Sequence, residues 1–101
     1  VKGNGMELPL VGLGTWQLMG EECTKVVQWA LELGYRHIDT AFYYDNHQAI
    51  QKAISGFDRS QLFITSKLAL EQVNPHAVQE SVRKACHTAL KELGTDYLDL
   101  Y

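Results

Sequence analysis

The stretch from Glu21 to Asp39, EECTKVVQWALELGYRHID, contains the pattern of a helix followed by the pattern of a short strand. The apolar side chains that fall on one stripe of the predicted helix at 21–33 are Val26, Val27, Ala30 and Leu31. Gly34 is suited to end that helix, and the β-prone segment 35–39 follows it directly. A helix that leads so quickly into a strand is typical of a β-α-β unit, in which the strands run parallel.

The same alternation of strand and helix recurs along the rest of the chain. Further strands are predicted at 10–14, 62–66 and 97–101. A second helix is capped by Asp45 or Asn46, and a third opens at Asn74-Pro75, where proline suits the first helical position. The apolar faces of these helices consist of Ala49, Ile50, Ala53 and Ile54, and of Val78, Val82, Ala85, Ala89 and Leu93.

The N-terminus carries the signal of a hairpin, Gly3-Asn4-Gly5, ahead of the first of these strands.

Two architectures are compatible with this order of strands and helices, a doubly wound open sheet and a (β/α)8 barrel. A complete barrel needs about 250 residues, and the chain has 101. A barrel could therefore be present only in part, as roughly the first three and a half of its eight units. Val1 and Tyr101 both look like cut ends.

Composition and charge exclude several classes of function. Nine basic and twelve acidic residues give a formal net charge of −3 without a run of like charge, so an electrostatic nucleic-acid surface is not expected. The longest apolar stretch, 8–13, is broken by Pro9 and Gly12, so we expect no membrane span and no signal peptide. Cys23 and Cys86 stand far apart, which favours reduced thiols in a cytoplasmic protein.

Polar side chains gather where the predicted strands end. The segments at these ends are Gly14-Thr15-Trp16, Asp39-Thr40-Ala41 and Thr65-Ser66-Lys67, with Tyr43 and Tyr44 in the loop after the second. Because ligands bind at the carboxyl ends of parallel strands, an acid, a phenol and an amine are expected on one rim. An ammonium within about 4–6 Å favours a phenolate, so such a phenol could protonate a carbonyl oxygen. The alternative is that these residues have no role in catalysis: the aspartate caps a turn, and the lysine is a solvated surface charge.

A resemblance to a known family rests on four stretches of the sequence. Residues 34–44, GYRHIDTAFYY, followed by Asn46, resemble the first signature of the aldo-keto reductases. Segments 12–16, 63–68 and 90–100 resemble three further stretches of the same family. The resemblance implies an α/β fold that is a partial (β/α)8 TIM barrel, with an N-terminal hairpin and roughly three and a half β/α units. It also implies that residues 1–101 are the N-terminal part of one barrel domain.

The family's roles can be carried onto positions of this chain. The resemblance implies an NADPH-dependent oxidoreductase that reduces aldehyde or ketone carbonyls of small molecules. Tyr44 would be the general acid, Lys67 the cation that makes the phenol more acidic, and Asp39 the carboxylate that pairs with Lys67. The residues expected at the cofactor are Gly14, Thr15, Trp16 and Asp39, and those expected in the substrate pocket are Trp16 and Tyr43.

The chain also departs from the family pattern. The family's catalytic histidine follows the fourth strand, and the chain ends before it. His37 is expected inside the second strand, whereas His47, His76 and His87 are expected on helices, and no pair has the spacing of a metal site. His47 and Gln51 also replace residues more common in the family. The alternative function is therefore a truncated fragment without independent reductase activity, and a nucleotide-binding open sheet is a third, weaker reading.

Overall fold

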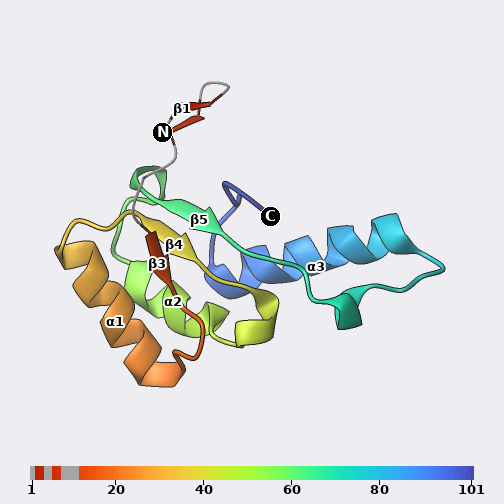
Figure 1. Ribbon diagram of the computed structural model, residues 1–101, viewed down its shortest axis with the longest axis horizontal. Coiled ribbons are helices and arrows are strands. Elements are labelled where there is room, and N and C mark those ends of the chain that lie inside the picture. Colours follow the sequence, from red (N-terminus) through yellow and green to blue (C-terminus); the bar gives the residue numbers. More distant parts are fainter. Residues whose placement is uncertain (1, 4–5, 8–11) are drawn as a thin grey trace.

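Three short parallel strands form the sheet of the computed structural model, which describes residues 2–3, 6–7 and 12–101 (Figure 1). They are β3 (Gly12–Gly14), β4 (His37–Asp39) and β5 (Phe63–Thr65), in the order β3-β4-β5. Gly14 pairs with Asp39, and Asp39 pairs with Thr65, so the three carboxyl ends lie at the same edge of the sheet. The predicted parallel β-α order is confirmed.

The predicted hairpin is present as an antiparallel pair, β1 (Lys2–Gly3) with β2 (Met6–Glu7). Gly3 is opposite Met6, so two residues connect the strands. The turn residues themselves, and positions 10 and 11 of the predicted first strand, lie outside the described residues.

Three helices pack on one side of the sheet, α1 (Gly20–Glu32), α2 (His47–Ile54) and α3 (Val78–Leu93) (Figure 1). Alternate strand residues, Ile38 and Ile64, point to that side and pack in the core. The core residues that are no more than 2% exposed include Cys23, Val27, Ile38, Ile50, Ile64 and Leu93. Of the predicted stripe on α1, Val26 is only half-buried, and Cys23 takes a core position instead.

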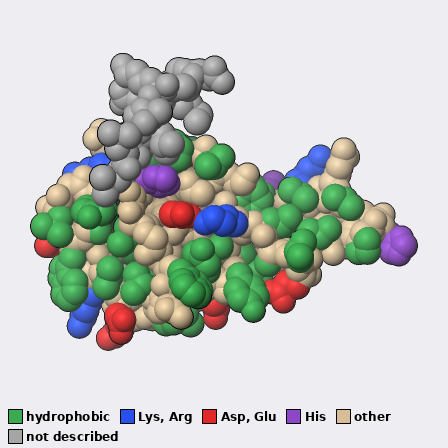
Figure 2. Space-filling model, viewed as in Figure 1, with side chains coloured by type: hydrophobic (Ala, Val, Ile, Leu, Met, Phe, Trp, Pro, Cys, Tyr) green, Lys and Arg blue, Asp and Glu red, His purple; other side chains and the backbone are tan. Residues whose placement is uncertain are grey.

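The other side of the sheet carries polar side chains. His37 and Asp39 alternate with Ile38 and therefore project away from the helices. His37 Nε2 lies 3.0 Å from Thr65 Oγ1, and its ring fills the space beside Gly12, where an added Cβ would lie 2.9 Å from Nδ1. Figure 2 looks onto this side, where histidine, acidic and basic side chains gather.

The third helix begins later than the sequence indicates. Asn74 precedes a turn at Pro75 and His76, and α3 starts at Val78. Asn74 Oδ1 accepts the His76 N–H at 3.0 Å, so the asparagine caps this turn and not the helix, and the prediction that His76 is helical was wrong. Val78 is 51% exposed, and the buried stripe of α3 starts at Ala85, because the first turns extend beyond the core (Figure 1).

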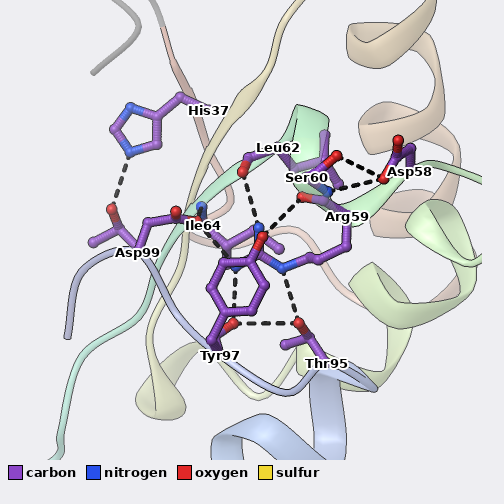
Figure 3. Close-up of polar contacts among 10 residues, drawn as sticks. His37, Asp58, Arg59, Ser60, Leu62, Ile64, Thr95, Tyr97 and Asp99 are labelled. Atoms are coloured by element: carbon purple, nitrogen blue, oxygen red, sulfur yellow. Dashed lines mark hydrogen bonds and ion pairs between the residues drawn. The ribbon is translucent and has the colours of Figure 1, made fainter. Parts of the chain in front are cut away.

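The predicted fourth strand at 97–101 forms only a single bridge, between Leu100 and Thr65. Backbone hydrogen bonds join this segment to β5 and the residue that follows it, from Asp99 N–H to Ile64 O at 3.0 Å and from Ser66 N–H to Leu100 O at 3.1 Å. Side chains add further contacts (Figure 3). Arg59 donates to the Tyr97 carbonyl at 2.8 Å and to Asp99 Oδ2 at 2.9 Å, and its guanidinium lies 3.9 Å from the centre of the Tyr97 ring. Asp99 Oδ2 also accepts the Ile64 N–H at 2.8 Å. This carboxylate thus occupies the edge of β5, where a fourth strand would place a carbonyl.

Candidate active site

Lys67 lies at the centre of the polar rim. Its Nζ forms an ion pair with Asp39 Oδ1 and donates to the Thr40 carbonyl at 3.1 Å. The same Nζ lies 5.5 Å from the centre of the Tyr44 ring. The structure therefore brings together the acid, the amine and one of the two candidate phenols, although they come from three segments of the chain.

Backbone hydrogen bonds between the strand ends produce this arrangement. The Thr40 N–H donates to Thr65 O at 2.8 Å, which continues the β4–β5 pairing beyond the last strand residue. The Phe42 N–H then donates to Lys67 O at 3.1 Å. Phe42 begins the 3₁₀ turn Phe42–Tyr44, so this bond fixes the tyrosine turn beside the lysine. The turn ends at Asp45, whose φ of 53° lies in the left-handed region that aspartate tolerates.

The two tyrosines of this turn differ in their surroundings. Tyr44 is half-buried with its ring beside Lys67, whereas Tyr43 is 76% exposed. The resemblance selected Tyr44 over Tyr43, and the proximity of the lysine favours the same choice. Trp16 is 68% exposed after the end of β3. Trp16 and Tyr43 are therefore free to contact a ligand at the rim.

Gly14 and Thr15 have different positions at the end of β3. An added Cβ on Gly14 would meet nothing within 4 Å, so this glycine leaves open space beside Asp39, its partner in the sheet. Thr15 is fully buried, and its N–H and Oγ1 both approach Asp39 O, at 3.0 and 3.2 Å. The threonine side chain thus supports the backbone of Asp39.

Asn46 connects the strand ends from beneath the rim. Of the two predicted caps, Asn46 occupies the N-terminal capping position of α2, but its side chain makes no hydrogen bond to the helix. It is 2% exposed, and its Nδ2 donates to Thr15 O at 2.8 Å and to Leu18 O at 3.1 Å. Its Oδ1 accepts from Thr40 Oγ1 at 2.8 Å. Its buried hydrogen bonds are thus committed to the loops after β3 and β4.

The residues on this rim fit a nicotinamide nucleotide as a ligand. The open space at Gly14 leaves room for a flat ring, and Trp16, two residues further along the chain, is exposed. The Asp39 carboxylate, 45% exposed as a side chain, can accept a hydrogen bond from a ribose hydroxyl.

In the part of the chain that the structure describes, no three histidine, cysteine or acidic side chains could hold a metal ion. No helix among the described residues is long and apolar enough to cross a membrane.

A parallel β-α order with catalytic residue types at the carboxyl ends of the strands is the arrangement of α/β barrel enzymes. A model of the aldo/keto reductase family matches residues 10–101, and the chain belongs to that family. It is 40% identical to aldo-keto reductase family 1 member A1 of Xenopus tropicalis, over 96% of the chain and 31% of that protein. It is 43% identical to glycerol 2-dehydrogenase (NADP(+)) of Saccharomyces cerevisiae, over 96% of the chain and 30% of that protein.

Solved structures agree with this assignment. An aldo-keto reductase from a deep-sea metagenome library of the Medee basin superposes with a TM-score of 0.88 and 40% identity. The Bombyx mori aldo-keto reductase in complex with NADP superposes with a TM-score of 0.85 and 34% identity. Each match covers 97% of this chain and about a third of the solved chain, 35% and 34%. The predicted fold class, part of a TIM barrel, is therefore confirmed, and the chain spans about a third of the length of its relatives.

Proposed function

We propose that residues 1–101 form the N-terminal part of the barrel domain of an NADPH-dependent reductase of aldehyde or ketone carbonyls. The observation that carries the proposal is the position of Lys67 Nζ, which is paired with Asp39 and lies 5.5 Å from the centre of the Tyr44 ring. The names of two relatives support the cofactor, since the yeast protein is an NADP(+) glycerol dehydrogenase and the silkworm structure contains NADP.

The chain's own residues act on the proton and not on the hydride. A bound nicotinamide would supply the hydride for the carbonyl carbon. Tyr44 donates its hydroxyl proton to the carbonyl oxygen, on which negative charge develops. Lys67 stabilises the phenolate that remains on Tyr44, and Asp39 keeps the ammonium oriented through the ion pair. Gly14, Trp16 and Asp39 form the cofactor side of the proposed site, and Trp16 and Tyr43 form its substrate side. Thr15, which is fully buried, contributes to the cofactor side by supporting the Asp39 backbone.

Replacing Tyr44 by phenylalanine in the complete protein tests this assignment. Tyr44→Phe keeps the ring and removes only the proton donor, so kcat for a model aldehyde should fall by about 10²–10⁴-fold. Binding of NADPH, followed by quenching of its fluorescence, should change little. The matched control is Tyr35→Phe, on a half-buried tyrosine that precedes β4 at the end of the strand opposite the rim, and it should retain most of the turnover. Unchanged turnover in Tyr44→Phe would reject the role of this residue.

A further inference from the structure

A second polar chain lies behind the rim and does not touch the expected cofactor positions. His47, the first residue of α2, is 4% exposed. Its Nε2 lies 2.8 Å from Ser66 Oγ, and its Nδ1 lies 3.0 Å from Glu92 Oε1 on α3. These contacts join residues that are 19 and 45 positions apart in the sequence. His47 on α2 thus links the loop after β5 to α3.

The hydrogen-bonding roles within this chain follow from what each group can do. An ionised Glu92 can only accept, so His47 Nδ1 carries a proton and donates it. In the neutral ring Nε2 is then an acceptor, and the Ser66 hydroxyl donates to it. Ser66 is fully buried, so this hydrogen bond is shielded from competing water. The network therefore holds Ser66 in one orientation.

The sequence of contacts resembles that of a serine hydrolase, with a serine, a histidine and a carboxylate in a row. A nucleophile must reach its substrate, and Ser66 is 0% exposed. The network is therefore not a hydrolase site. Its effect is on the residue that follows Ser66, which is Lys67.

Ser66 directly precedes Lys67, and both residues are fixed to their surroundings. The Ser66 N–H donates to Leu100 O at 3.1 Å, while its hydroxyl bonds to His47. Lys67 O accepts the Phe42 N–H at 3.1 Å. The backbone that carries Lys67 is thus anchored on one side by the tyrosine turn and on the other by Leu100 O and, through the Ser66 side chain, by His47. Removal of the histidine would release the side-chain part of the second anchor.

We propose that His47 is a positioning residue for Lys67, acting through Ser66 and held by Glu92. The proposal rests on the proposed function, because Lys67 is the cation beside the general acid. Together with the preceding Asn46, which bonds to Thr15 O and Thr40, His47 makes the first turn of α2 a common support for all three strand ends.

A double-mutant cycle in the complete protein tests the route of action. His47→Ala and Ser66→Ala should each lower kcat for a model aldehyde about tenfold, with KM for NADPH nearly unchanged, because small displacements of a catalytic group are costly. The double variant should be no worse than Ser66→Ala alone, since His47 acts only through that hydroxyl. His47→Gln should recover much of the loss, because its amide can donate to Glu92 and accept from Ser66.

Thr24→Val is the matched control for a general loss of stability. Thr24 Oγ1 donates to Ala49 O at 2.9 Å, so the substitution removes a hydrogen bond that holds α2 but does not touch Ser66. It should leave kcat close to that of the unmodified protein. Additive losses in the double cycle, or a fall in kcat of the same size in Thr24→Val, would overturn the positioning role.

A readout without turnover separates this proposal from the proposed function. The NMR signal of Lys67 Nζ reports the environment of the ammonium directly. It should shift in His47→Ala and Ser66→Ala and stay in place in Thr24→Val, whether or not the protein reduces carbonyls. A shifted signal in a protein without reductase activity supports the positioning contact and overturns the proposed function. An unmoved signal in His47→Ala overturns the positioning role.

Discussion

The ion pair between Lys67 and Asp39 is too exposed to be explained by stability. The two side chains are 47% and 45% exposed. Pairs with this degree of hydration contribute about 0–1 kcal/mol to folding. Under the proposed function, the Asp39 carboxylate instead keeps the Lys67 ammonium next to the proton donor Tyr44.

Cys23 illustrates the opposite case, a group whose burial affects stability. It is 0% exposed, and burial raises the pKa of its thiol above the ordinary value of 9.0, because the thiolate would lose its hydration. At alkaline pH the unfolded chain releases this proton before the folded protein does. The unfolded state then binds fewer protons, so the free energy of unfolding falls as pH rises.

The expected result is a loss of stability that begins as pH approaches 9.0, the pKa of the unfolded thiol, and continues as pH rises toward the higher folded pKa, measured by urea unfolding at each pH. Full stability is present below the unfolded pKa and is lost as pH rises through the folded pKa. Cys23→Ala should flatten this slope, because it removes the titrating group. Burial and the nearby Cys86 also raise the pKa of Tyr101, which contributes with the same sign. If the slope in Cys23→Ala equals that of the unmodified protein, the thiol is not its source.

At the scale of single elements, the glycines that end helices can be compared directly. Gly34 and Gly94 follow α1 and α3 with φ of 101° and 68°, whereas Gly56 has no positive φ. An added Cβ at Gly34 or Gly56 would meet nothing within 4 Å, but at Gly94 it would lie 2.7 Å from Gln51 Nε2. Gln51 is exposed and flexible, so its side chain can move away cheaply, and the backbone should decide the outcome.

We therefore expect Gly34→Ala and Gly94→Ala to lower the free energy of unfolding by about 1–2 kcal/mol each, the cost of a left-handed residue with a side chain. Gly56→Ala, the matched control, should change it by less than about 0.5 kcal/mol. Thermal or urea unfolding measures all three. If Gly94→Ala is much worse than Gly34→Ala and Gln51→Ala rescues it, the side-chain contact dominates instead.

At the scale of the whole molecule, packing is uneven along α3 and the C-terminal segment. The end of α3 is anchored by Ala89 and Leu93, which are 2% and 0% exposed, whereas Val78 at its start is 51% exposed. Tyr97 and Leu100 are 44% and 53% exposed, although Arg59 and Asp99 fix their segment. A segment with few buried side chains can open locally at a small free-energy cost, because little apolar surface becomes exposed.

Amide hydrogen exchange should therefore be graded within a single helix. Amides at 82–84, in the exposed first half of α3, should exchange faster than those at 89–93, and amides of α1 near Val27 should be the slowest. Exchange measured by NMR gives all of these rates in one sample, so the buried half is an internal control. Equal protection along α3 would show that something other than this core stabilises its first turns.

Much of the fold was predictable from the sequence, because helix and strand patterns are local. The spacing of Ala49, Ile50 and Ile54 predicts a face that is buried in α2, and Gly34 ends α1 where the pattern indicates. The strand ends then place Asp39 and Lys67 on one rim, since parallel strands finish at the same edge. Periodicity and chain direction suffice for these conclusions.

The tertiary structure alone decided where the polar side chains bond. Asparagine is a residue type that often caps helices, yet the Asn46 amide donates to the carbonyls of Thr15 and Leu18, which lie 31 and 28 residues away. His47 has no sequence signal that links it to Ser66 or Glu92, and α3 begins at Val78 because Asn74 caps an earlier turn. The physical reason is that a hydrogen bond depends on distance and direction between two groups. Only the packed chain brings such groups together, whereas burial of an apolar stripe can be read from spacing along one element.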